Sequence, residues 1–117
     1  MKKSLRRIKM TVSRLIDELG LEVLSLPFPE REIRGGFTGD LLSWVMGRAK
    51  EGDAWITIMS NVNIVAVASL ADPSCIILSE NVTPDDGVVE RASAQGVNLL
   101  KSCKDTFSVS AEIATLL

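Results

Sequence analysis

The sequence of 117 residues contains no histidine and no tyrosine, and its only aromatic residues are two tryptophans and three phenylalanines. Without histidine, the chain lacks the most common general base, the most common metal ligand and the usual pH switch. With so few aromatic residues, the core must consist mainly of valine, isoleucine, leucine and alanine. Hydrophobic residues make up 46% and charged residues 24% of the chain, which is the composition of an ordinary globular domain.

Cysteine is also scarce. Cys75 and Cys103 form no CxxC pair, which predicts two free, buried, reduced thiols, with a disulfide or a metal-binding pair as the alternative. Two cysteines without histidine cannot supply the four ligands of a zinc site, so we expect no metal site and no cofactor. No apolar run approaches the roughly 20 residues that span a bilayer, and the basic start lacks the apolar stretch of a secretory signal. We therefore expect a cytoplasmic protein with no membrane partner.

Charge is unevenly distributed along the chain. Residues 1–14 carry six basic residues and no acidic one, whereas residues 15–117 carry seven basic against 15 acidic residues, a net charge of −8. We interpret residues 1–10 as a basic N-terminal extension and 11–117 as one domain, because a single core is feasible at this length. The acidic body argues against a nucleic-acid partner, since phosphate contacts require a basic surface.

Hydrophobic periodicity predicts an α/β fold. Strands are expected at 22–26, 54–58, 74–78 and 97–100, and helices at 12–19, 40–49, 64–71, 83–95 and from Ser102 or Asp105 to the end. From Ala54 onward strand and helix alternate, which is typical of a mostly parallel sheet flanked by helices. Thr83-Pro84 followed by two aspartates is a strong helix-start signal. Residues 1–36 add a helix and one or two short strands that extend an edge.

The chain has no GxxxxGK[ST], GxGxxG or GxSxG motif, so no known phosphate loop or nucleophile elbow is present. In an open parallel sheet, ligands lie beyond the carboxyl ends of the strands, where polar segments here lead into helices. Two interpretations fit: these side chains only cap helices, or they bind a phosphate- or carboxylate-bearing metabolite. The candidate ligand-binding residues are Gly35, Gly36, Thr57, Ser60, Asn61, Asn63 and Thr83.

The expected helix 64–71 is apolar almost all round, so it needs cover on more than one side. Burial by its own chain is one interpretation, and the face of a homodimer is the other. For the dimer, Ile64 and Ala68 on this helix and Trp44 on the preceding one are the candidate interface residues.

Three stretches, 34–46, 51–57 and 61–68, together resemble the DRTGG domain. They contain Gly-Gly, Asp-Leu-Leu-Ser, Gly-Asp-x-Trp-Ile-Thr and Asn-Ile-Val-Ala-Val-Ala in this order, and the similarity runs from about Thr11 to the end. Arg34 stands where the family motif has threonine. The resemblance implies an α/β module similar to the N-terminal domain of HPr kinase/phosphorylase, a family that also occurs inside phosphotransacetylases and beside CBS domains in certain pyrophosphatases. It carries no catalytic residues over to this chain.

These observations favour a non-enzyme. Our leading hypothesis is a non-catalytic regulatory or oligomerisation module that forms a homodimer and binds a small anionic metabolite or nucleotide. The alternative is a protein-interaction subunit of a larger metabolic enzyme complex, with a partner enzyme and no ligand of its own. A third hypothesis is a small enzyme that uses Lys101, Ser102 and Asp105 at the strand ends, although nothing in the sequence indicates the preorganised pocket it would need.

Overall fold

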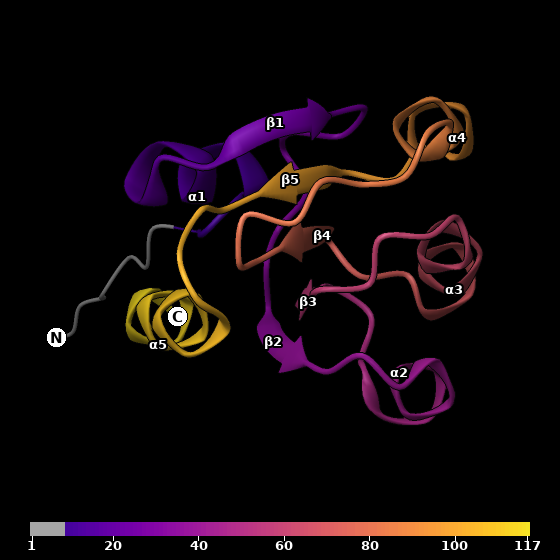
Figure 1. Ribbon diagram of the computed structural model, residues 1–117. Coiled ribbons are helices and arrows are strands. Elements are labelled where there is room, and N and C mark those ends of the chain that lie inside the picture. Colours follow the sequence, from indigo (N-terminus) through magenta and orange to yellow (C-terminus); the bar gives the residue numbers. More distant parts are fainter. Residues whose placement is uncertain (1–8) are drawn as a thin grey trace, which may run out of the picture.

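The computed structural model describes residues 9–117, which form three layers, a central sheet with helices on both faces (Figure 1). The helices are α1 (Val12–Leu19), α2 (Leu42–Arg48), α3 (Asn63–Ala71), α4 (Val88–Gln95) and α5 (Thr106–Leu116). The strands are β1 (Glu22–Ser25), β2 (Gly35–Thr38), β3 (Asp53–Thr57), β4 (Cys75–Leu78) and β5 (Leu99–Lys101). The predicted α/β class is confirmed.

The five strands lie in the order β1-β5-β4-β3-β2. Strands β2, β3, β4 and β5 are parallel to one another, while β1 pairs antiparallel with β5 and extends that edge. The predicted mostly parallel sheet is therefore confirmed. Its parallel part begins at β2, one strand earlier than the alternation from Ala54 onward predicts.

Side chains of the central strands alternate between two helical layers. Trp55 and Ile76 pack toward α2, α3 and α4, whereas Ile56 and Ile77 pack toward α1 and α5. Figure 1 shows α2, α3 and α4 in a row on one side of the sheet, with α1 and α5 on the other. Because both faces are covered, every residue of β3 and β4 is buried, which explains their continuous apolar sequences.

Local signals set several of the helix ends. Thr11 accepts a hydrogen bond from the Arg14 main-chain N–H (3.1 Å), and Gly20 ends α1 with a φ of +64°. The sequence offers Thr11 or Ser13 as the cap of this helix and Gly20 as its stop, and the structure uses Thr11 and Gly20. Asp105 caps α5 in the same way, through the Ser108 main-chain N–H (2.7 Å), which decides between the two predicted starts of that helix.

The predicted helix start at Thr83 is wrong, because α4 begins at Val88 after Gly87, whose φ is +86°. Long-range bonds hold the preceding segment against the sheet edge instead. The Thr83 hydroxyl accepts from Lys101 Nζ (3.0 Å), and the Asp85 main-chain N–H donates to the Ser60 carbonyl (2.9 Å). These contacts override the local helix signal of Pro84 and the two aspartates.

Two other predictions are corrected at single residues. Both cysteines are free, as expected, but only Cys75 is buried, and Cys103 is exposed. Met10 belongs to the core rather than to an extension, since it is 9% exposed and its carbonyl accepts from the Ile33 N–H (2.8 Å). The rest of the predicted basic extension, residues 1–8, lies outside the described residues. None of the helices in residues 9–117 has the length and the apolar sequence that a membrane span requires.

Candidate functional site

The carboxyl ends of the parallel strands carry most of the predicted ligand-binding residues, and their side chains bond to other groups of the chain. Thr57 is 1% exposed, and its hydroxyl donates to Asp40 Oδ1 (2.7 Å). The Ser60 hydroxyl donates to Asp85 Oδ1 (3.0 Å). Both hydroxyls therefore already have strong acceptors.

The remaining residues of this edge are engaged in a similar way. Asn61 Oδ1 accepts from the Asn63 main-chain N–H (2.9 Å), within the turn that opens α3. The Thr83 hydroxyl accepts from Lys101 Nζ (3.0 Å), so that the sheet edge already binds this side chain. These contacts occupy the side chains within the chain itself, but none of them caps a helix, since neither α3 nor α4 has a side-chain cap bond.

The charge of this edge disfavours an anion at Thr57 and Ser60. Asp40 also accepts from the Ile58 main-chain N–H (2.9 Å), and within residues 9–117 neither Asp40 nor Asp85 forms an ion pair. A phosphate or carboxylate bound to these hydroxyls would lie beside two carboxylates that form no ion pair in the described part of the chain. The predicted anionic ligand thus lacks electrostatic support at this position.

Gly35 and Gly36 do not join the other predicted ligand residues. They pair with Asp53 and Ala54 at the start of β3, whereas Thr57 ends that strand. Four residues of strand separate the two places by roughly 13 Å. A Cβ on Gly35 would lie 2.9 Å from Asp53 Oδ1, so the packing of this aspartate explains the glycine without a ligand.

The predicted homodimer residues divide into one exposed and two buried positions. Trp44 is 53% exposed and stacks under the Arg48 guanidinium, which lies 4.1 Å from the centre of its ring. Ile64 and Ala68 are 0% and 3% exposed within the single chain, because they face the sheet and pack with Trp55 and Ile76. This corrects their assignment to an interface, and it leaves Trp44 as the candidate.

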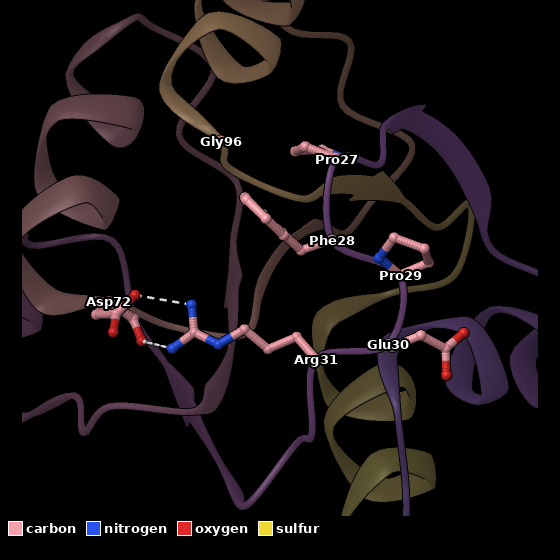
Figure 2. Close-up of a pocket in the computed structure, with 7 residues that line it drawn as sticks. All are labelled: Pro27, Phe28, Pro29, Glu30, Arg31, Asp72 and Gly96. Atoms are coloured by element: carbon pink, nitrogen blue, oxygen red, sulfur yellow. Dashed lines mark hydrogen bonds and ion pairs between the residues drawn. The ribbon is translucent and has the colours of Figure 1, made fainter.

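The amino-terminal edge of the sheet, which the sequence analysis did not single out, contains a hollow of about 540 Å³. Figure 2 shows Phe28 and Arg31 leaving the same loop segment and pointing toward Gly96 and Asp72. The lining residues are Pro27, Phe28, Pro29, Glu30, Arg31, Asp72 and Gly96. The segment 27–31 joins β1 to β2 and crosses the starts of β5 and β4, whereas Asp72 and Gly96 follow α3 and α4.

A buried asparagine fixes one wall of this hollow. Asn98 is 3% exposed, and its Oδ1 accepts from the Phe28 main-chain N–H (2.9 Å). Its Nδ2 donates to the Phe28 carbonyl (2.8 Å) and to the Ser74 carbonyl (3.0 Å). One side chain thus binds both main-chain polar groups of Phe28, a residue that is itself 56% exposed.

An ion pair fixes the opposite wall. Arg31 Nη1 donates to Asp72 Oδ1 (2.7 Å), and Nη2 donates to the Asp72 carbonyl (2.8 Å). Asp72 follows the last residue of α3 and adopts a left-handed φ of 60°, a conformation that asparagine and aspartate tolerate better than most residues. Two bonds from one guanidinium hold its plane in a fixed orientation.

A second, more polar cavity of about 310 Å³ continues from the first. The two cavities share Phe28, Arg31, Asp72 and Gly96, and the second adds Ser69 and Gln95 among its lining residues. The only local signal for this region is the Pro27-Phe28-Pro29 sequence, which predicts a rigid extended segment around an aromatic residue. Within residues 9–117, no group of three or more His, Cys, Asp or Glu side chains could hold a metal ion.

Comparison with known proteins finds a family model that matches the chain and a solved structure with a similar fold. Residues 38–116 match the family model of the DRTGG domain, and no curated protein matches the chain. The fold is similar to the crystal structure of the CBS and DRTGG domains in the regulatory region of Clostridium perfringens pyrophosphatase, complexed with its activator diadenosine tetraphosphate. The TM-score is 0.68 at 19% identity, over 92% of this chain and 47% of that one. The chain therefore spans about half the length of that structure.

Proposed function

Because the chain belongs to the DRTGG domain family, we propose that it is a non-catalytic regulatory module whose small-molecule ligand controls a partner enzyme. Support comes from the similar fold within the regulatory region of a pyrophosphatase, a protein that binds a nucleotide activator. For this chain we propose the same general class of ligand, a nucleotide or related metabolite. It also retains the predicted location in the cytoplasm.

The observation that carries this proposal is the hollow at the amino edge. Three hydrogen bonds of Asn98 and two of Arg31 hold its walls in place, so little order has to be created when a ligand binds. Its volume of about 540 Å³ falls in the range of small-molecule sites, roughly 300–1,000 Å³. The carboxyl-edge residues Thr57, Ser60, Asn61, Asn63 and Thr83 remain the competing site.

A thermal-shift panel of nucleosides, nucleotides, acyl phosphates, phosphosugars and carboxylates tests this function. A ligand at about 100 times its Kd adds about 2.7 kcal/mol to the free energy of unfolding, which raises the Tm of a domain of this size by several degrees. A reproducible shift with one chemical class supports the proposal. The absence of any shift across the panel contradicts it.

We also propose a homodimer that uses the exposed face of α2 around Trp44. A half-exposed tryptophan beside an arginine is typical of the anchors found at protein interfaces. Light scattering at micromolar concentration should give twice the monomer mass of 12.7 kDa, and Trp44→Ser should return it to the monomer value. A monomeric unsubstituted chain would rule the dimer out.

The second candidate function is an interaction subunit without a ligand, favoured by apolar side chains at the carboxyl edge. Leu41, Ile58 and Phe107 are 60%, 44% and 85% exposed. Asp40 binds the Ile58 N–H, and the Ser79 and Thr106 hydroxyls lie 2.6 Å apart, which brings the start of α5 beside this edge. For this function, Phe107→Ser should weaken binding to a co-purifying enzyme at least tenfold, whereas Phe28→Ser should not.

A further inference from the structure

The two connected cavities at the amino edge differ in chemistry, and the difference indicates the shape of a ligand. The first is walled by the Phe28 ring and the prolines on either side of it, and the second by polar side chains such as Ser69 and Gln95. A ligand that fills both has an apolar face at one end and hydrogen-bonding groups at the other.

Flat groups line the first cavity. The Phe28 ring lies against Gly96, where an added Cβ would approach Phe28 Cε2 to 2.9 Å, so only glycine leaves the ring in this position. In Figure 2 the guanidinium of Arg31 extends from the same segment to Asp72. Phenyl rings and guanidinium planes are the two kinds of surface on which protein-bound bases stack.

The charge of the lining does not favour phosphate. Arg31 is paired with Asp72 at 2.7 Å, and Glu30 adds a further negative charge. The three charged residues of the first cavity therefore sum to a small net negative charge. A neutral ring system suits this hollow better than a group with several negative charges.

The polar end offers hydrogen-bonding groups that the protein does not use itself. Within residues 9–117, the Gln95 side-chain amide makes no hydrogen bond, and Asp72 Oδ2 likewise accepts none, because Arg31 bonds to Oδ1 and to the carbonyl. An amide and a carboxylate oxygen together can receive and donate the bonds of an amino-substituted heteroaromatic ring.

We propose that this hollow binds the base of a nucleoside, stacked on Phe28 and with its amino-bearing edge toward Asp72 and Gln95. This inference rests on the proposed regulatory function and names the class of its ligand. It also states which part of the ligand is recognised: the base carries the affinity, and any phosphate groups lie outside the hollow.

The experiment measures Kd by isothermal titration calorimetry for adenosine, guanosine, ATP and GTP. We expect one of the two nucleosides to bind, and its triphosphate to bind within about threefold of it. Phe28→Ala should weaken binding at least tenfold. Phe28→Leu, which keeps an apolar contact over Gly96 but removes the flat ring, should have nearly the same effect even if the alanine variant is unstable.

Phe107→Ala is the matched control, since it removes an exposed phenyl ring at the opposite edge of the sheet and should leave Kd within twofold. In ¹H–¹⁵N spectra, the nucleoside should shift the Gly96 amide and the Asn98 side-chain amide, and leave the Asn63 side-chain amide unmoved.

Two results overturn the inference while leaving the proposed function intact: a triphosphate more than tenfold tighter than its nucleoside, or binding that neither Phe28 variant weakens. Binding of a phosphosugar or carboxylate from the thermal-shift panel, with no response to either nucleoside, has the same meaning. A panel without any shift removes the proposed function and this inference together.

Discussion

The two edges of the sheet use their polar side chains in opposite ways. At the carboxyl edge, Thr57 and Ser60 donate to the carboxylates of Asp40 and Asp85. These side chains therefore use their hydrogen-bonding groups on one another. At the amino edge, Asn98 bonds only to main-chain atoms and holds a loop segment in place beside a hollow. Polar residues at strand ends therefore do not mark a site by themselves. A ligand site is expected where the hydrogen bonds of these residues fix the wall of a hollow, and not where their side chains pair with one another across the surface.

The same comparison explains why the amino edge tolerates an exposed ring. Phe28 is 56% exposed, which leaves apolar surface in water at a cost of roughly 25 cal/mol per Å². The two bonds that Asn98 makes to the Phe28 main chain fix the position from which the ring extends. At the carboxyl edge, Phe107 is also exposed, but it lies on a regular helix whose cap at Asp105 fixes its direction.

The largest expected effect comes from breaking the amino edge at Asn98. Asn98→Ala removes three hydrogen bonds of 2.8–3.0 Å. The Phe28 N–H and the Ser74 carbonyl lose this partner, and the Phe28 carbonyl keeps only its bond from the Arg31 N–H (3.2 Å). We expect a loss of about 2–4 kcal/mol in the free energy of unfolding and a Tm lower by roughly 10 °C. Chemical denaturation and calorimetry measure both quantities.

Asn63→Ala is the control for this substitution, because the Asn63 side chain is exposed at the opposite edge. It should change the free energy of unfolding by less than about 0.5 kcal/mol. Equal effects of the two substitutions would show that Asn98 does not clamp the segment, and the hollow would lose its fixed wall.

How much of this could be predicted from the sequence depends on the range of the contacts involved. The strands at 54–58 and 74–78, the cap at Thr11 and the stop at Gly20 were predictable, because hydrophobic runs and capping residues act over a few positions. The start of α4 was not predictable. There, the Pro84 signal is local, while the bonds of Thr83 to Lys101 and of Asp85 to Ser60 span 18 and 25 positions.

The candidate site shows the same limit more strongly. The bond between Phe28 and Asn98 joins residues 70 positions apart, and the pair of Arg31 and Asp72 spans 41. No local pattern reveals either contact. Thr57 ends β3 and Ser60 and Asn61 follow it, as the sequence places them. The carboxylates that accept from the Thr57 and Ser60 hydroxyls, Asp40 and Asp85, lie elsewhere in the sequence.

The buried Cys75 and the exposed Cys103 are expected to differ in how they affect the pH dependence of the free energy of unfolding. Burial at the start of β4 raises the pKa of the Cys75 thiol from its ordinary 9.0 to about 12. Between these values the folded chain keeps the proton and the unfolded chain loses it. The unfolded state then binds fewer protons, so the free energy of unfolding falls as pH rises, by about 1.4 kcal/mol per pH unit above about pH 9.

Urea denaturation at pH 8, 9 and 10.5 under reducing conditions measures this slope. Cys75→Ala should remove the contribution of the thiol, whereas Cys103→Ala, at an exposed position, should leave the slope unchanged. With a thiol reagent at pH 8, the native protein should react rapidly at Cys103 and at Cys75 only after unfolding. An unchanged slope in Cys75→Ala would mean that water reaches the thiol in the folded state.

The smallest expected loss of stability comes from the carboxyl edge, where it tests whether the hydroxyls serve the fold rather than a ligand. Thr57→Val keeps the shape of the side chain but removes its bond to Asp40 and its acceptor for the Met59 N–H (3.2 Å). We expect a loss of about 1 kcal/mol in urea denaturation, and Ser60→Ala, at a more exposed bond, should cost less than about 0.5 kcal/mol. A Thr57→Val variant that keeps its stability but loses ligand binding would contradict this view. The hydroxyl would then serve a ligand rather than the fold, and the carboxyl edge would replace the amino edge as the site.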